Sequence, residues 1–451
     1  MAERSRTQDY RRVADAVEAD IAAGRLRAGD RLPPQRDFAR AHAIANSTAA
    51  RVYGELTRRG LVVGEVGRGT YVRAAGERAF ALADPTSAPV DLELSVPAVP
   101  EQFPLLADGL ARMLRPDVLK ATLRPVGAAG TPEARAAAPG VLARPGWRPA
   151  AESVLFTGNG RQAIAAALAA LVPPGGRLGV EELTYPAVRA IAARLGITLV
   201  PLELDADGVR PDAVAAAHRS ARLHAIYVQP TLHNPMSFTM PPERRAELAD
   251  LAETLELDIV EDGVWSHLAD DPAPPLAAYA PDRTVFVDSL SKRVAPGLTV
   301  GFAVPPARRA DAVAQAIRSG AWTAPRFSLE AATGWIQDGT VTRIGNAKRA
   351  DVKSRQRAVA AALTGFRART APDAYMCWWE LPDPWRADTF VAAAARRGIA
   401  VTPGAAFAVR PASAPNAVRL GLASPPPDVL ATALQTLASL ARTGPDTDTV
   451  S

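Results

Sequence analysis

Apolar residues at the start of the chain recur at the spacing of amphipathic helices. Val13, Val17 and Ile21 share one face of a first helix. Pro33 and Pro34 stand where proline favours the opening of a second helix. Polar residues from position 46 can cap a third helix, whose apolar positions again follow helical spacing. The three helices are expected over residues 10–22, 35–43 and 48–59.

The third helix precedes two short β-branched runs, 61–63 and 70–72, on either side of a glycine-rich stretch at 64–69. Such runs around glycines are typical of a β-hairpin. Three helices followed by a hairpin predict a winged helix-turn-helix over residues 1–75.

Beyond residue 100 the pattern changes to short apolar runs, most of them separated by helical stretches. This alternation is typical of a parallel or mixed sheet with helices on both faces. The expected strands cover residues 153–156, 177–180, 197–204, 223–228, 257–260, 284–288 and 299–304.

The pattern changes again after about residue 325. A long charged helix is expected over 343–363, followed by strand candidates MCWWEL and AVRLGLA. We therefore expect a multi-domain chain: a winged helix-turn-helix head, a large α/β domain and a smaller α+β domain. The boundaries are 1–75 for the head, 76–100 for a linker, 101–325 for the large domain, 326–442 for the smaller domain, and 443–451 for a disordered tail.

Composition narrows the classes of protein. The longest apolar run, 163–172, is about half the roughly 20 residues of a membrane span. The first residues lack the apolar core of a signal peptide, so we expect a cytoplasmic protein without membrane contact. One cysteine, Cys377, excludes an internal disulfide framework and a cysteine-based zinc cluster, and no metal is expected.

Charge is distributed unevenly along the chain. Residues 1–78 hold 15 arginines against 10 acidic residues, a net charge of +5. The whole chain also carries +5, so the remainder is neutral. A positive N-terminal unit is consistent with binding to double-stranded DNA, although the chain is rich in arginine throughout.

The head resembles the GntR-type winged helix. The stretches LPPQR, NSTAARVYGEL and GLVVGEVGRGTYV match its LPxxR motif, recognition helix and GLVxxxxGxGTxV wing in order. The resemblance implies a recognition helix in the major groove. The DNA-contacting candidates are Arg36, Ser47, Thr48, Arg51 and, at the wing tip, Arg68.

In the rest of the chain, polar residues follow the expected strands, where open α/β sheets bind ligands. A glycine-rich turn at 157–162 leads into a helix and could hold an anion. The other candidates are Tyr185, the amide of Asn234, Asp262, Ser289 with Lys292, and Arg419. Each has an ordinary structural alternative, such as a packed loop aromatic for Tyr185.

Their order resembles fold-type I aminotransferases, and head plus body resembles the MocR subfamily of GntR regulators. The resemblance spans about residues 10–440 and implies the cofactor pyridoxal phosphate. It places the Schiff base on Lys292 and the partner of the ring nitrogen on Asp262. It implies that Gly160, Arg161, Gln162 and Ser289 receive the phosphate. Asn234 would bind the ring hydroxyl, Tyr185 would stack on the ring, and Arg419 would bind an effector carboxylate.

This chain departs from the family pattern at three groups that bind the phosphate or assist proton transfer. Thr299 replaces the usual phosphate-binding arginine, and we expect Arg161, rather than Arg293, to compensate. Trp265 stands where a tyrosine is common, and residues 123–135 lack the tyrosine that the family contributes across its dimer interface.

We therefore expect a homodimeric regulator that responds to an amine, an amino acid or pyridoxal phosphate itself. An active aminotransferase with an accessory head and a cofactor-free regulator are the alternatives.

Overall fold

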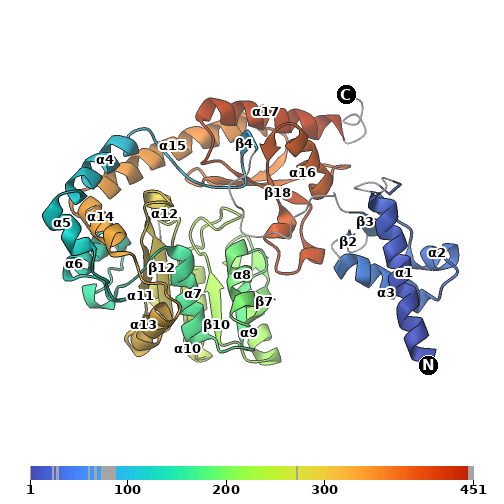
Figure 1. Cartoon of the computed structure of the whole chain (residues 1–451), viewed down its shortest axis with the longest axis horizontal. Coiled ribbons are helices and arrows are strands. Elements are labelled where there is room, and N and C mark those ends of the chain that lie inside the picture. The colour runs from blue at the N-terminus through green and yellow to red at the C-terminus, as the bar shows by residue number, and fades with distance from the viewer. Residues whose placement is uncertain are drawn as a thin grey trace.

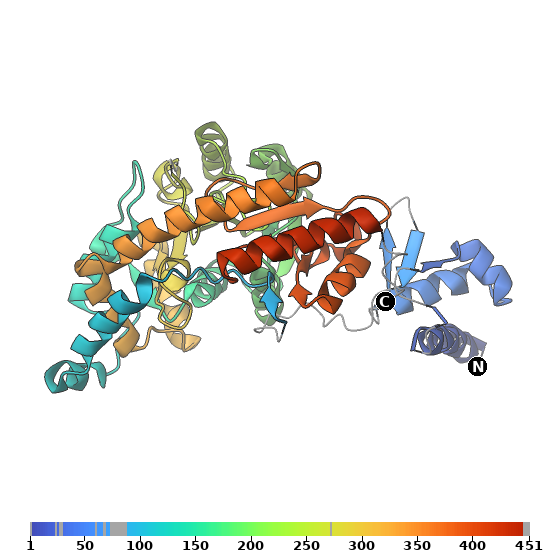
Figure 2. The same ribbon diagram turned by 90° about the horizontal axis from the view of Figure 1, so that it is seen from above.

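The computed structural model describes residues 2–22, 25–26, 30–58, 61–65, 69–72, 88–270 and 273–444. The head stands at one end of the molecule, beside the C-terminal domain, and the helices that follow residue 100 stand at the opposite end (Figure 1). Figure 2, the view from above, shows the same order along the long axis.

The head consists of three helices and a small antiparallel sheet. Its apolar side chains gather in one core in which Ala49, Val52 and Leu56 of the third helix are fully buried. The sheet order is β1-β3-β2. The first helix begins at Ala2, eight residues before its predicted start. The elements are α1 (Ala2–Ala22), β1 (Arg31–Leu32), α2 (Gln35–Ala41), α3 (Asn46–Arg58), β2 (Val62–Glu65) and β3 (Gly69–Val72).

The large domain is built on a seven-stranded sheet in the order β5-β13-β12-β11-β10-β6-β7. All seven predicted strands belong to it. Five neighbouring strands run parallel, and β13 is antiparallel to both of its neighbours. The strands are β5 (Leu155–Thr157), β6 (Arg177–Glu181), β7 (Thr198–Leu202), β10 (Ala225–Val228), β11 (Asp258–Asp262), β12 (Thr284–Ser289) and β13 (Gly301–Val304).

Alternate residues of the central strands enter different cores on the two faces of the sheet. In β10, Tyr227 packs on one face and Ile226 and Val228 on the other, as the two-residue period of a strand requires. Helices cover both faces. The first face carries α7 (Gly160–Leu171), α8 (Pro186–Arg194) and α13 (Ala310–Ser319), and the second carries α9 (Pro211–Ser220), α10 (Pro242–Thr254) and α11 (Leu276–Tyr279). Between β7 and α9, β8 (Leu204–Asp205) and β9 (Gly208–Val209) form a small antiparallel pair.

Four helices pack together at the end of the molecule opposite the head (Figure 1). They are α4 (Gln102–Met113), α5 (Pro116–Thr122), α6 (Pro132–Leu142) and α14 (Arg326–Gln337). The long helix α15 (Thr340–Ala362) follows and extends from this group to the C-terminal domain (Figure 2).

The C-terminal domain combines a four-stranded sheet, in the order β14-β15-β18-β17, with two helices. Its core is rich in tryptophan and leucine, including the buried Trp379 and Trp385. Its elements are β14 (Arg367–Arg369), β15 (Met376–Glu380), α16 (Ala387–Arg396), β16 (Ile399–Ala400), β17 (Thr402–Pro403), β18 (Ala417–Gly421) and α17 (Pro427–Thr443). Thr443, assigned to the tail from the sequence, ends α17, and residues 445–451 lie outside the described part of the chain.

Residues 88–100, which the sequence pattern assigns to the linker, pack on the body. Val90–Asp91 form β4, which pairs in parallel with β16, and Leu92 is fully buried in the C-terminal core. This short strand was missed because a two-residue element has no period that a sequence can show. Residues 76–87 of the predicted linker lie outside the described residues.

The wing of the head touches the C-terminal domain of the same chain. Strand β2 contacts the short turn η4 (Pro411–Ser413). The guanidinium of Arg386, just before α16, lies 3.7 Å from the ring centroid of Tyr71 in β3. A cation over an aromatic face is an attractive contact, so the head has a defined resting place on the body.

Candidate functional site

The candidate site lies where several central strands end, between the large and C-terminal domains. Helix α7 begins here at Gly160, and the four-residue helix α12 (Leu290–Arg293) follows β12 directly. Parallel strands bring their carboxyl ends to one edge of the sheet. Residues far apart in the sequence therefore meet around Lys292.

Lys292 is enclosed by both domains. Its Nζ donates a hydrogen bond to the carbonyl of Ser95 and lies 5.0 Å from the ring centroid of Trp265. Burial, followed by the charges of Arg419 and Arg161, lowers the pKa of Lys292 to about 7, and Asp262 opposes the shift. A neutral amine is the reactive form of a lysine nucleophile. Lys292 is therefore suited to react with a carbonyl group near neutral pH.

A second buried lysine, Lys348, hydrogen bonds to the backbone of the segment that contains Lys292. Lys348 of α15 is fully buried, and its Nζ donates to the carbonyls of Lys292, at 3.1 Å, and Val294, at 2.7 Å. Burial, followed by the charge of Lys292, lowers the pKa of Lys348 to about 7. The sequence shows Lys348 only as a rare lysine on a long helix, so its contact with α12 was missed.

Asp262 ends β11 and is almost fully buried. Its Oδ2 accepts hydrogen bonds from Tyr227 Oη at 2.7 Å and Gln229 Nε2 at 2.8 Å. Its Oδ1 accepts from the Val264 amide at 3.1 Å. Burial raises the pKa of Asp262, and these hydrogen bonds oppose the rise. The sequence pattern identified neither Tyr227 nor Gln229, although a polar residue directly after a buried strand is a detectable signal.

Asn234 and Tyr185 lie in neighbouring loops of the site. Asn234 is 8% exposed, its amide N–H donates to Gln229 Oε1 at 3.2 Å, and its own Oδ1 has no hydrogen-bond partner. Tyr185 precedes α8, and its hydroxyl accepts a hydrogen bond from Arg161 Nε at 3.0 Å. A buried amide oxygen without a partner is costly, which is expected of a group that awaits a ligand.

The start of α7 packs closely against Ser289. A Cβ at Gly160 would lie 3.0 Å from Ser289 Oγ, so glycine allows this approach. Asn159 Oδ1 accepts the Gln162 amide N–H at 3.0 Å. The Gln162 N–H, expected to face an anion, therefore already donates to the N-cap residue Asn159. Thr299, in the place of the family's arginine, hydrogen bonds through Oγ1 to Ser291 Oγ at 2.9 Å.

Arg293, which directly follows Lys292, is held in a buried ion pair. Asp288 Oδ2 lies 2.7 Å from a terminal nitrogen of Arg293 and 2.7 Å from one of Arg144. Arg161 is exposed and makes no ion pair within the described part of the chain. The contacts therefore favour Arg161, not Arg293, as the arginine available to an anion.

Arg419 of β18 is 8% exposed and approaches the site from the C-terminal domain. Its two terminal nitrogens donate to Ser95 Oγ at 3.3 Å and to the Glu93 carbonyl at 2.6 Å. Its Nε is buried without a hydrogen-bond partner. Burial lowers the pKa of Arg419 to about 10, with Glu93 and Asp91 opposing the shift, so it is a cation at neutral pH.

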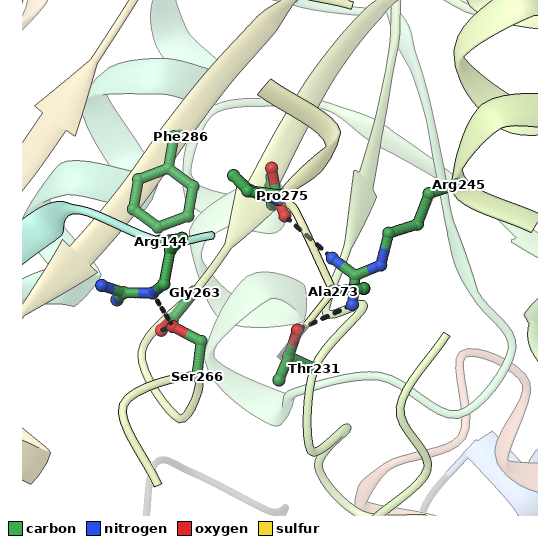
Figure 3. A pocket seen from close by; sticks show the side chains of 9 residues that line it. Arg144, Thr231, Arg245, Gly263, Ser266, Ala273, Pro275 and Phe286 are labelled. Atoms are coloured by element: carbon green, nitrogen blue, oxygen red, sulfur yellow. Dashed lines mark hydrogen bonds and ion pairs between the residues drawn. The ribbon is translucent and has the colours of Figure 1, made fainter. Parts of the chain in front are cut away.

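A small cavity lies nearby but contains none of the predicted site residues. Arg144 and Arg245 face it from two sides (Figure 3). Both arginines are already satisfied: Arg144 donates to Ser266 Oγ at 2.9 Å and Arg245 to Thr231 Oγ1 at 2.8 Å. We interpret this cavity as part of the packing.

In the head, the predicted DNA-contacting residues lie around the start of α3. Arg36, Ser47 and Arg51 are exposed and Thr48 is partly exposed. The guanidinium of Arg51 lies 4.4 Å from the ring centroid of Tyr10 in α1. Arg68, the predicted wing-tip residue, lies outside the described residues.

Two searches of the described residues gave no candidates. They contain no group of three or more His, Cys, Asp or Glu side chains placed to hold a metal ion. No described helix combines the length and apolarity that crossing a membrane requires.

Comparison with known proteins supports both halves of this architecture. Residues 9–72 match the family described as bacterial regulatory proteins, gntR family. The HTH-type transcriptional regulator YdeF of Bacillus subtilis is 28% identical over 92% of this chain and 90% of its own length. The vitamin B6 salvage pathway transcriptional repressor PtsJ of Salmonella typhimurium is 26% identical over 90% and 91%.

Among solved structures, an archaeal alanine:glyoxylate aminotransferase has the same body fold. It superposes with a TM-score of 0.71 at 21% identity, covering 87% of this chain and 94% of that one. The winged head, the curated relatives and the body fold lead to one conclusion. Residues 9–72 form a gntR-family helix-turn-helix head, the body has the aminotransferase fold, and the whole chain is similar to HTH-type transcriptional regulators.

Proposed function

We propose that this regulator binds pyridoxal phosphate at Lys292 and that occupancy of the site controls DNA binding by the head. The observation that carries the proposal is the meeting of Lys292, Asp262, Arg161 and Arg419 at one edge of the sheet, around an amine whose pKa burial lowers to about 7. Perturbed titratable groups gathered at such an edge are typical of functional sites.

The residues fit the chemistry of the cofactor. Gly160, Arg161 and Ser289 would hold the phosphate, because a helix start and a free guanidinium both favour an anion. Asp262 would pair with the ring nitrogen, held in place by Tyr227 and Gln229. The unpartnered amide of Asn234 would face the ring hydroxyl, and Tyr185 would contact the ring face. When bound, the cofactor supplies an amine-reactive aldehyde and an electron-withdrawing ring.

The departures from the family pattern at Trp265 and Thr299 favour a sensor over a working aminotransferase. Trp265 lies beside Lys292 and offers only an N–H donor, so it cannot take up a proton as tyrosinate can. Thr299 bonds Ser291 and carries no charge for a phosphate. The relative PtsJ is named a vitamin B6 salvage repressor. We infer that the effector is pyridoxal phosphate or an amine or amino acid that reacts with it, with Arg419 binding a carboxylate.

A homodimer would present two heads to two DNA half-sites. Among the described residues, the large exposed apolar side chains all lie in or directly after α4 and α5, or in the first turn of α14. An apolar group of this kind is typical of a protein interface. The residues are Phe103, Leu114, Leu119, Leu123 and Phe327.

The test is covalent trapping of the cofactor. The full chain is incubated with pyridoxal phosphate, reduced with borohydride, digested and analysed by mass spectrometry. We expect the adduct on Lys292, no specific adduct in Lys292→Ala, and an unchanged one in Lys353→Ala, whose lysine is on the surface. Because the pKa of Lys292 is lowered to about 7, labelling should rise as the pH passes through 7 and level off above it. Labelling spread evenly over the lysines would refute cofactor binding at this site.

The second candidate function is transamination, which the body fold itself favours. It is tested by incubating the loaded protein with amino donors and α-keto acids. We expect at most a single turnover, because the groups that assist proton transfer are altered. Sustained multiple turnover would establish an enzyme instead of a sensor.

A further inference from the structure

The segment from Asp91 to Val96, which we call the strap, crosses the candidate site directly after β4. Asp91 Oδ1 accepts the amide N–H groups of Glu93, at 2.8 Å, and Leu94, at 2.9 Å, which turns the chain inward. The Leu92 carbonyl accepts the Gly421 amide at 2.7 Å. The start of the strap is thus fixed to the C-terminal domain.

The middle of the strap occupies both groups that we assign to ligands. The Ser95 carbonyl accepts the hydrogen bond of Lys292 Nζ, and Ser95 Oγ accepts from Arg419. The Glu93 carbonyl accepts from the other terminal nitrogen of Arg419 at 2.6 Å. Two oxygen atoms of the strap therefore meet the arginine as the two oxygens of a carboxylate would.

A serine of the C-terminal domain holds the strap from outside the site. Ser424 Oγ donates to the Leu94 carbonyl at 2.8 Å and accepts the Val96 amide N–H at 3.2 Å. Within the described part of the chain, Ser424 Oγ hydrogen bonds to the strap and to neither Lys292 nor Arg419. It therefore allows the strap to be loosened without altering either ligand-binding group.

We propose that the strap is an internal competitor of the effector, and that a ligand at Lys292 and Arg419 displaces Ser95 and Glu93 and so releases the strap. This inference rests on the proposed function and adds the means of regulation. A bidentate carboxylate needs at least one terminal nitrogen of Arg419, and the strap engages both. The partnerless Nε of Arg419 shows that the strap satisfies the guanidinium only in part.

The position of the strap explains how its release could reach the head. The head ends at Val72 in β3, and the strap begins at Asp91, only one residue after the start of β4. Displacement of the strap removes the hydrogen bonds that directly follow β4, the first described strand of the body on the side of the head. A ligand shifts such an equilibrium only through a difference in affinity between two states. Here that difference is the set of hydrogen bonds that ligand and strap cannot both make.

Amide hydrogen exchange of the wild-type full chain tests the displacement. Exchange in peptides covering residues 90–98 is compared without ligand, with pyridoxal phosphate, and with sodium maleate as a dicarboxylate probe. We expect both probes to speed exchange at the Val96 amide, whereas ligands ordinarily slow exchange around their site. Unchanged or slower exchange with both probes would overturn the inference.

Ser424→Ala supplies an independent test by the sign of its effect. If the strap competes with ligands, losing its two outer hydrogen bonds should tighten maleate and pyridoxal phosphate binding by about fivefold. If the strap instead belongs to the binding site, the variant should bind more weakly, and the inference fails. Ser153→Ala is the matched control, because Ser153 Oγ also donates to a backbone carbonyl but lies on the surface.

The two proposals fail in distinguishable ways. Lack of cofactor labelling on Lys292 refutes cofactor binding, while the maleate measurements still decide the role of the strap. Labelling on Lys292 together with an unmoved strap refutes the strap inference alone.

Discussion

Arg161 and Arg293 flank the candidate phosphate site in opposite surroundings. Arg161 is exposed, with a tyrosine hydroxyl as its hydrogen-bond acceptor, whereas Arg293 is buried against Asp288. The sequence offers both arginines as replacements for the charge missing at Thr299. The position of Arg161 in the glycine-rich turn already favours it, and the three-dimensional contacts add that the carboxylate of Asp288 holds Arg293.

This difference predicts opposite phenotypes. Arg161→Ala should weaken pyridoxal phosphate binding by about 10- to 100-fold through loss of a charge-assisted contact, with little change in stability. Arg293→Ala should instead cost about 3 kcal/mol of stability, because it removes one partner of a buried charge. Equilibrium titration of the cofactor and urea denaturation measure the two effects. Wild-type affinity in Arg161→Ala would contradict the assignment, and partial rescue by Arg161→Lys would support it.

Residues that extend a recognisable motif could be located from the sequence, and residues that reach the site from elsewhere could not. Asp262 ends β11, Lys292 follows β12 and Arg419 lies within β18, so each belongs to a stretch with a recognisable pattern. Lys348 belongs to a long helix and Ser95 to a segment predicted as a linker, and the local sequence of neither indicates a contact with the site. Their contacts depend on how separate domains pack, which no local spacing encodes.

At the scale of elements, helix α5 shows an apolar surface that its own chain does not cover. None of its residues is buried, and Leu123, immediately after it, is 78% exposed. Leucine at such a position gains nothing in a monomer, so another surface is expected to cover it.

We expect Leu123→Glu to convert a dimer into a monomer at micromolar concentrations. A carboxylate placed in an apolar interface loses its hydration without gaining a partner. Multi-angle light scattering measures the mass, and Thr432→Glu on the exposed face of α17 is the control. If the wild-type chain is monomeric, or if Leu123→Glu remains dimeric, the assigned interface is wrong.

The long elements were predicted well because their patterns are strong. The strands of the large sheet are short apolar runs, and some, such as β10 and β13, are buried throughout, so composition marks them. Boundaries shifted by one or two residues, for example where β12 continues to Ser289. Helix α1 extends beyond its apolar face to Ala2, into polar sequence that periodicity does not mark.

At the scale of the whole molecule, one contact between head and body can be tested by mutation. The guanidinium of Arg386 lies on the ring of Tyr71, and the wing strand β2 contacts η4. The head therefore rests on the C-terminal domain of its own chain.

Removing this contact should loosen the head without unfolding it. A cation–π contact contributes roughly 1–2 kcal/mol, so Arg386→Ala should reduce the docked population several-fold. Small-angle X-ray scattering should then show a larger radius of gyration, while Arg386→Lys keeps the cation and should stay near wild type. An unchanged scattering profile would show that Arg386 does not hold the head.

The pairing of β4 with β16 also determines where this regulator can be cut and rejoined. Because Val90–Asp91 and Leu92 belong to the fold of the body, a chimera joined near residue 100 would remove an edge strand and a core residue from the receiving body. A junction between Val72 and residue 88 spares every described element on both sides. Heads for different operators could then be exchanged at that junction while the body is kept whole.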